Sequence, residues 1–182
     1  YGTLNMSLTE FRHWRLDYDM DKVCWLTLDR AGESTNTLSR EVLQELAAIV
    51  DEFVKAPPRG VVLQSGKKNS FVVGADVREF ENVTNPQDAA DSIREVHALF
   101  NRIEALPFPM VVTIEGYCLG GGLELALSCH YRIAKNTEGT RLGFPEVRLG
   151  IYPGFGGSAR TTRLLGGPKT LELMLSSRMV RA

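Results

Sequence analysis

The sequence predicts a layered α/β domain built around a largely parallel sheet. Short apolar runs alternate with amphipathic helical stretches along the chain, an order typical of consecutive βα units. The runs are almost continuously apolar and end at glycine or proline, as expected for strands covered on both faces. The chain has 182 residues, 43% of them hydrophobic, so its length suits one domain, residues 1–182, with a sizeable core.

The N-terminal part predicts two strands followed by a helix. Residues 10–30 are expected to form two strands joined by the polar turn Asp19–Lys22. Residues 39–57 then carry apolar side chains at helical spacing, namely Val42, Leu46, Ile49 and Phe53. Ser39 is available to cap this helix, and Pro57–Pro58 end it.

The same pattern repeats towards the C-terminus. Residues 60–66 predict a buried strand, and residues 85–107 predict a helix. The apolar stripe of that helix consists of Ala89, Ile93, Val96, Phe100 and Ile103. The remaining predicted elements are, in order, a strand at 110–116, a helix at 123–129, a short strand at 131–135 and helices near 156–165 and 168–177.

Composition and charge exclude several classes of function. A formal net charge of −1 gives no sign of a nucleic-acid binder or a membrane-surface protein. No apolar run approaches the roughly 18 residues that a membrane span needs. Residues 1–14 resemble neither a signal peptide nor an Arg-rich presequence, so we expect a cytoplasmic protein. A small basic cluster, Arg160, Arg163 and Lys169, is expected to be a solvated face.

The cysteines and histidines predict neither a disulfide framework nor a metal site. The three cysteines form no Cys-x-x-Cys pair and are expected to be small core residues: Cys24, Cys118 and Cys129. The three histidines lack metal-ligand spacing and are expected to be structural: His13, His97 and His130.

Glycine is concentrated in one part of the chain. Ten of the 17 glycines lie between Gly116 and Gly157, although each glycine inside regular structure costs roughly 0.5–1 kcal/mol relative to alanine. Tight turns account for some of them. The triplet Gly120–Gly122, however, directly precedes a predicted helix, whose start offers unpaired amides and the positive end of the helix dipole. Glycines there would let a substrate oxygen approach the amides, as in an oxyanion hole.

Two glutamates lie in apolar surroundings. Glu124 follows Gly121 by one helical turn and is flanked by leucine and alanine, so burial would raise its pKa into a range useful for proton transfer. The alternative is an ordinary first-turn acid that complements the helix dipole. Glu146 follows a proline and is flanked by Phe144 and Val147, and its alternative role is an ion pair with Arg148. The sequence does not show whether the two glutamates meet.

Two further segments are relevant to a binding site. The apolar run Phe71–Val73 ends at Gly74 and Ala75, and a short helix is expected from Asp76, so the Ala75 amide is a candidate second donor. Residues 154–159 match the dinucleotide-binding fingerprint in form. They follow no full strand and lie in no βαβ unit, so that interpretation is rejected.

Three segments together resemble the enoyl-CoA hydratase (crotonase) family. They are "SFVVGADVREF", "IEGYCLGGGLELALSCHYRIA" and "LGFPEVRLGIYPGFGGSARTTRLLG". The resemblance extends from about Val23 to the end of the chain and is greatest to the hydratase part of the multifunctional fatty-acid β-oxidation α-subunit branch. It implies a crotonase-like spiral of ββα units from which the family's C-terminal helices are missing. It further implies an open site with weak or no activity in the isolated chain, and a dehydrogenase domain that would lie downstream.

The resemblance also implies a reaction and the residues for it. Family members bind acyl-CoA thioesters, and hydratases add water to trans-2-enoyl-CoA, with CoA as part of the substrate and no separate cofactor. The implied catalytic groups are the amides of Ala75 and Gly121 and the carboxylates of Glu124 and Glu146. The implied substrate-binding residues are Gly74, Asp76, Gly120, Gly154, Thr35, Asn36 and Leu38.

Two alternatives remain open at this stage. One is a Δ-isomerase of the same family, which needs mainly one glutamate. The other is a non-catalytic acyl-CoA-binding or assembly module, which the retention of two costly acids in apolar settings disfavours. The expected partners are an acyl-CoA or enoyl-CoA thioester and, in a longer protein, a homo-oligomer or a thiolase subunit. Neither nucleic acid nor a membrane is expected as a partner.

Overall fold

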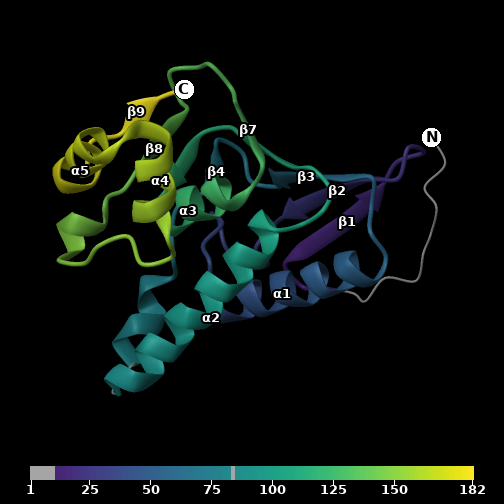
Figure 1. Cartoon of the computed structure of the whole chain (residues 1–182), viewed down its shortest axis with the longest axis horizontal. Coiled ribbons are helices and arrows are strands. Elements are labelled where there is room, and N and C mark those ends of the chain that lie inside the picture. The colour runs from purple at the N-terminus through teal and green to yellow at the C-terminus, as the bar shows by residue number, and fades with distance from the viewer. Residues whose placement is uncertain (1–10, 83–84) are drawn as a thin grey trace.

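The computed structural model describes residues 11–82 and 85–182, whose strands form two sheets (Figure 1). The larger sheet has the strand order β1-β2-β3-β5-β7. Its strands are β1 (Trp14–Tyr18), β2 (Val23–Leu28), β3 (Gly60–Ser65), β5 (Met110–Ile114) and β7 (Tyr131–Ala134). Strand β1 pairs antiparallel with β2, and the other neighbours are parallel. The predicted α/β class with a largely parallel sheet is therefore confirmed.

The N-terminal hairpin forms where the sequence predicts it. Lys22 adopts a left-handed φ of 62° in the turn, and the Asp19 carboxylate accepts the amides of Asp21 at 2.9 Å and Val23 at 3.0 Å. The aspartate thus closes the turn with its own side chain, as turn aspartates commonly do.

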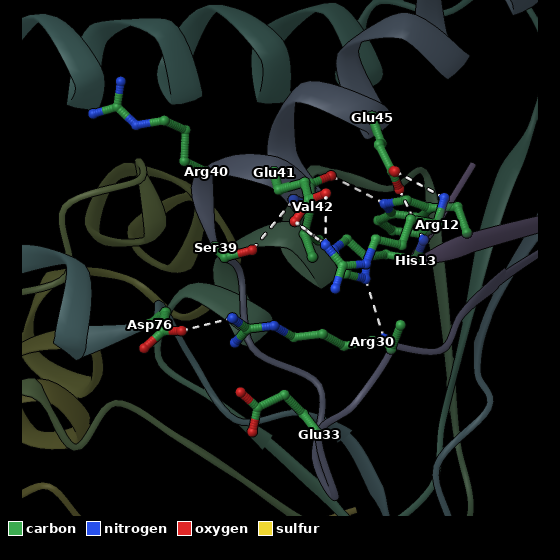
Figure 2. A network of polar contacts seen from close by, with 12 residues as sticks. Arg12, His13, Arg30, Glu33, Ser39, Arg40, Glu41, Val42, Glu45 and Asp76 are labelled. Carbon is green, nitrogen blue, oxygen red and sulfur yellow. Dashed lines mark hydrogen bonds and ion pairs between the residues drawn. The ribbon is translucent and has the colours of Figure 1, made fainter. Parts of the chain in front are cut away.

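Helix α1 (Arg40–Lys55) also follows the prediction. Ser39 caps it by accepting the amide of Val42 at 3.3 Å, and its apolar stripe is fully buried. Figure 2 shows how the first turns of α1 are tied to the chain before β1, because the Glu45 carboxylate accepts the amides of Arg12 and His13. His13 is buried, and its ring accepts the Ala31 amide, which confirms its structural role.

Helix α2 (Pro86–Glu104) lies beside α1 (Figure 1). Asn85 caps it by accepting the Gln87 amide at 2.9 Å. Only the C-terminal half of its predicted stripe enters the core, since Val96, Phe100 and Ile103 are buried. The N-terminal half, Ala89 and Ile93, lines a cavity instead.

A second, smaller sheet was not predicted from the sequence. Its order is β4-β6-β8-β9, with strands β4 (Ser70–Val72), β6 (Tyr117–Leu119), β8 (Arg141–Gly143) and β9 (Val180–Arg181). Strands of two or three residues are too short to show a hydrophobic period, which explains the omission. The pairs β4–β6 and β6–β8 are parallel.

The chain alternates between the two sheets in ββα units. Successive units are β3-β4-α2, β5-β6-α3 and β7-β8-α4, with α3 at Gly121–Ser128 and α4 at Gly157–Leu165. In each unit the first strand joins the larger sheet and the second joins the smaller one. This is the expected spiral of ββα units.

Two boundaries differ from the prediction. The strand at 110–116 does not lead directly into the glycine triplet, because β6 intervenes, and α3 begins at Gly121 rather than at residue 123. A Cβ on Gly122 would lie 2.3 Å from the carbonyl oxygen of Val72, so glycine lets α3 pack directly on β4. The short helix expected from Asp76 is a 3₁₀-helix, η1, at Val77–Asn82.

The remaining elements complete the C-terminal part. They are η2 (Glu146–Leu149) and α5 (Gly167–Ser176). All three cysteines are buried and free of disulfides, as expected of core residues. Among residues 11–82 and 85–182, no helix combines the length and apolar character required to cross a membrane.

Candidate active site

The three motif segments meet at one edge of the smaller sheet. Strands β4, β6 and β8 are parallel neighbours, so their carboxyl ends lie side by side. Gly74 and Ala75 follow β4, Gly120 and Gly121 follow β6, and Glu146 follows β8. Carboxyl edges of parallel sheets are where α/β proteins usually bind ligands.

Two backbone amides lie close together at this edge. Gly74 and Gly120 have left-handed φ values of 119° and 53°, which turn the chain sharply after β4 and β6. A Cβ on Gly121 would lie 3.4 Å from the nitrogen of Ala75, so the two main chains are in direct contact. Within the part of the chain that the structure describes, neither the Ala75 nor the Gly121 amide donates to an acceptor. These two unengaged amides are the candidate donors to a ligand oxygen.

A short parallel bridge holds the Ala75 segment in place. The Leu38 amide donates to the Gly74 carbonyl at 2.8 Å, and the Asp76 amide donates to the Leu38 carbonyl at 3.2 Å. The Val73 amide also donates to the Asn36 carbonyl, at 3.0 Å. The two segments 35–38 and 73–76, which contain substrate-binding residues implied by the family resemblance, therefore lie side by side.

Asp76 anchors the same segment through its side chain (Figure 2). Its carboxylate is buried and pairs with the Arg30 guanidinium at 2.8 Å and with Arg78 at 2.8 Å. The hydrogen bonds from Arg78, and then those from Arg30, hold the pKa of Asp76 well below its usual range. The carboxylate is fully engaged within the protein, so Asp76 contributes to the site mainly by fixing the backbone.

Asn36 has a structural side chain as well. Its amide group donates to the carbonyls of Leu28 at 2.9 Å and Phe71 at 3.2 Å and to the Ser65 hydroxyl at 3.0 Å, and it has no exposed surface. The Asn36 side chain is therefore engaged within the protein and does not face a ligand. Thr35 next to it is exposed.

Glu124 is held by a loop from a distant part of the sequence. Its side chain is 1% exposed, and Oε1 accepts the amides of Phe155 at 2.8 Å and Gly157 at 2.7 Å. Burial raises the pKa of Glu124 to about 7, although the two amides lower it, and the negative charge of Glu146 raises it further. An ordinary first-turn acid would instead be solvated.

Glu146 opens η2 close to the glycine triplet. Its side chain is 8% exposed, and burial raises its pKa. Its Oε1 lies 2.9 Å from the point where a Cβ on Gly120 would stand. Its Oε2 is buried without a hydrogen-bond partner among the described residues. The Arg148 guanidinium donates to the Ser177 hydroxyl at 2.5 Å, and no ion pair joins Arg148 to Glu146 within those residues.

A largely apolar cavity of about 390 Å³, with Ala75 in its lining, was not predicted from the sequence. Its apolar lining comes from the loop before α1, from α1 and α2, and from the loop after η2: Leu38, Leu43, Ala47, Ile93, Val96 and Phe155. The sequence signal for this cavity was the N-terminal half of the apolar stripe of α2. Apolar side chains that do not enter the core are expected to line another surface, such as a cavity.

The binding of Glu124 by the loop at 154–157 is the second feature that sequence reasoning missed, although Gly154 itself was an expected site residue. The His97 ring contacts the Gly154 carbonyl, with Nε2 at 2.5 Å from the oxygen, and Arg160 donates to the Phe155 carbonyl at 3.2 Å. The expectation that Arg160 belongs to a solvated basic face is wrong, because its side chain is 6% exposed and forms an ion pair with Glu104.

Residues 19–182 match the family model described as enoyl-CoA hydratase/isomerase. The chain belongs to the enoyl-CoA hydratase/isomerase family. It is 41% identical over 165 residues to the fatty acid oxidation complex subunit alpha of Aliivibrio fischeri, covering 90% of this chain and 24% of that protein. It is 45% identical to the subunit of that name from Shewanella amazonensis, covering 88% of this chain and 23% of that protein. The family member described here thus spans about a quarter of the length of these relatives.

Solved structures of the family share the fold. An enoyl-CoA hydratase from Bacillus anthracis superposes with a TM-score of 0.84 at 33% identity, covering 93% of this chain and 65% of that one. An enoyl-CoA hydratase from Geobacillus kaustophilus superposes with a TM-score of 0.87 at 26% identity, covering 95% of this chain and 64% of that one. The crotonase-like fold of this family member is therefore established.

Proposed function

We propose that the protein hydrates trans-2-enoyl-CoA thioesters to 3-hydroxyacyl-CoA. The observation that carries the proposal is the combination of two buried carboxylates, Glu124 and Glu146, with the two unengaged amides of Ala75 and Gly121. Two amides suit an oxyanion, and two acids suit the separate proton transfers that adding water requires.

The proposed reaction uses each group once. The thioester oxygen accepts hydrogen bonds from the Ala75 and Gly121 amides, and one such donor typically lowers a barrier by roughly 3–4 kcal/mol. Glu124 takes a proton from water as the water oxygen bonds to C3, and the C2–C3 π electrons move into the enolate. Glu146 then gives a proton to C2, so the atoms of one water molecule are added.

The protonation states support these roles. A carboxyl group whose pKa is about 7, as for Glu124, can accept a proton and release it near neutral pH. Glu146 also has a raised pKa, and its unpartnered Oε2 favours the protonated form, which can donate to C2.

The substrate would extend in two directions from the amides. We place the acyl chain in the apolar cavity between α1 and α2, and CoA along residues 35–38 and 73–76, with CoA as part of the substrate and no separate cofactor. We also propose that the Gly154 amide helps to hold the reacting water. A cytoplasmic location, and assembly with a thiolase subunit or as a homo-oligomer, are proposals for the whole protein.

The test is the loss of the enoyl thioester's ultraviolet absorbance when crotonyl-CoA is mixed with the protein, together with detection of 3-hydroxybutyryl-CoA by mass spectrometry. Turnover of a 3-enoyl-CoA to the 2-enoyl isomer without hydration would favour the isomerase instead. Calorimetric binding of crotonyl-CoA without turnover would favour the non-catalytic module. A protein that neither binds nor converts the thioester would overturn the proposal.

A further inference from the structure

One peptide unit connects α2 to the buried acid of the site. The carbonyl of Gly154 lies 2.5 Å from Nε2 of His97, and the amide of the same peptide, on Phe155, donates to Glu124 Oε1 at 2.8 Å. A carbonyl is an acceptor, so His97 must carry its proton on Nε2 to form this bond. Since the peptide unit is planar, the hydrogen bond that fixes its carbonyl also fixes the direction of its N–H.

The next peptide is bound by Arg160 of α4, and Arg160 in turn is bound by α2. Arg160 donates to the Phe155 carbonyl at 3.2 Å, and its remaining nitrogens bond to Asn101 at 2.8 Å and Glu104 at 3.0 Å. His97, Asn101 and Glu104 follow one another at spacings of four and three, so they share one face of α2. Of these two consecutive peptides, the first is therefore bound by α2 directly and the second through Arg160.

A ring contact strengthens the attachment. Phe100 and Phe155 meet edge to face with centroids 6.0 Å apart, between the two polar attachments. The loop that carries the amides for Glu124 thus has three separate contacts with α2 or its partner Arg160. Of these, the His97 bond acts on the peptide whose N–H reaches the carboxylate.

We propose that His97 is a positioning residue for Glu124, acting through the Gly154–Phe155 peptide. The inference rests on the proposed function, because positioning is of use only where Glu124 transfers protons. Donation by His97 polarises the peptide and strengthens the Phe155 amide as a donor, as in other hydrogen-bonded chains. Loss of the His97 bond leaves the carboxylate less firmly held and less well oriented towards water.

Two substitutions that differ by one methylene test the idea. In His97→Gln, the side-chain amide places an N–H near the position of Nε2 and can donate to the Gly154 carbonyl, whereas the shorter amide in His97→Asn cannot reach it. His97→Leu removes the donor while keeping a good helix former, should the asparagine variant fold poorly. Arg94→Gln is the matched control, because Arg94 is an exposed α2 side chain whose ion pair, among the described residues, is with Asp91 on the same helix.

The first readout separates kcat from KM for crotonyl-CoA. His97→Asn and His97→Leu are expected to lower kcat roughly 10-fold or more, because small misplacements of catalytic groups carry such costs. KM should change by less than about twofold, since no contact with the substrate is lost. His97→Gln should restore most of kcat, and the control should leave it unchanged. Equal kcat in all four variants would overturn the proposal, as would a loss that His97→Gln fails to reverse.

The second readout needs no catalytic activity. The Glu124 carboxyl carbon is titrated by carbon-13 NMR and assigned with Glu124→Gln. Because the loop amides lower the pKa of Glu124, loss of the His97 bond should raise it, with His97→Gln closer to wild type. An unchanged titration would refute positioning even if the wild-type protein hydrates crotonyl-CoA. Conversely, a raised pKa of Glu124 in the variants of a protein without hydratase activity would refute the proposed function but not the positioning of Glu124 by His97.

Discussion

The carboxylate of Glu124 is in direct contact with the main chain of Gly157. The Gly157 amide donates to Oε1 at 2.7 Å, and a Cβ on Gly157 would lie 2.6 Å from Cγ of Glu124 and 3.0 Å from the Phe144 ring. Alanine at 157 would therefore have to push aside the acid that its own amide binds. The absence of a side chain at this position is what allows so close a hydrogen bond.

Gly157→Ala should accordingly damage both activity and stability. Because Glu124 must move, we expect the hydration rate to fall at least about 10-fold and the free energy of unfolding to fall by roughly 1–3 kcal/mol, as for other overpacked sites. Steady-state kinetics and urea denaturation measure the two effects. Gly167→Ala is the control, since a Cβ there meets nothing within 4 Å. A Gly157→Ala variant as active as this control would contradict the geometry.

Replacing either acid by its amide should abolish most turnover without removing binding. Glu124→Gln and Glu146→Gln are expected to lower kcat roughly 10²–10⁴-fold, the range typical of a lost general acid or base. The affinity for crotonyl-CoA, measured by calorimetry, should change little. Glu115→Gln is the matched control, because Glu115 is exposed, pairs with Lys135 and is not one of the candidate site residues. Wild-type rates in both site variants would rule out the assigned roles.

Glu124 should also make stability depend on pH. Its pKa is raised from 4.5 to about 7 on folding, so its contribution is most favourable below pH 4.5 and is lost as the pH rises through 7. At about 1.4 kcal/mol per unit, the loss amounts to roughly 3 kcal/mol. Glu124→Gln removes this titration while its carbonyl still accepts both amides. The stability of the variant relative to wild type should therefore rise between pH 4.5 and 7 in denaturant titrations, and a constant difference would contradict the assignment.

The Arg30–Asp76 pair should behave in the opposite sense. The pKa of Asp76 is lowered on folding, so its contribution is present above pH 3.8, the ordinary value, and is lost as the pH falls below it. Asp76→Asn leaves Arg30 largely buried without its partner charge and should cost about 3 kcal/mol at neutral pH. The difference from wild type should shrink in acid. Asp91→Asn, which breaks an exposed pair with Arg94, should cost less than about 1 kcal/mol at any pH.

The long elements of this fold could be predicted from hydrophobic period and capping alone. Helix α1 shows why, since Ser39 caps it and every residue of its predicted stripe is buried. The smaller sheet could not be predicted in this way. Its strands β6 and β8 are stabilised by pairing with each other and are too short to carry a hydrophobic period.

The candidate site divides in a similar way. The apolar neighbours of Glu124 pointed to a buried acid, but its bonding partners lie 31 and 33 residues further along, at Phe155 and Gly157. Such pairings depend on how the ββα units stack. Arg160 shows the same dependence on tertiary structure. Its charge predicts a solvated side chain, but in the folded protein it is buried because Glu104 and Asn101 on another helix bond to it.

The parallel bridge between Leu38 and Ala75 has a thermodynamic consequence for any ligand of the Ala75 amide. The bridge already restricts the backbone at Ala75 in the folded protein, so ligand binding costs little further conformational entropy there. An incoming oxygen therefore meets a stiff, preorganised donor, and more of the intrinsic strength of that hydrogen bond survives as affinity.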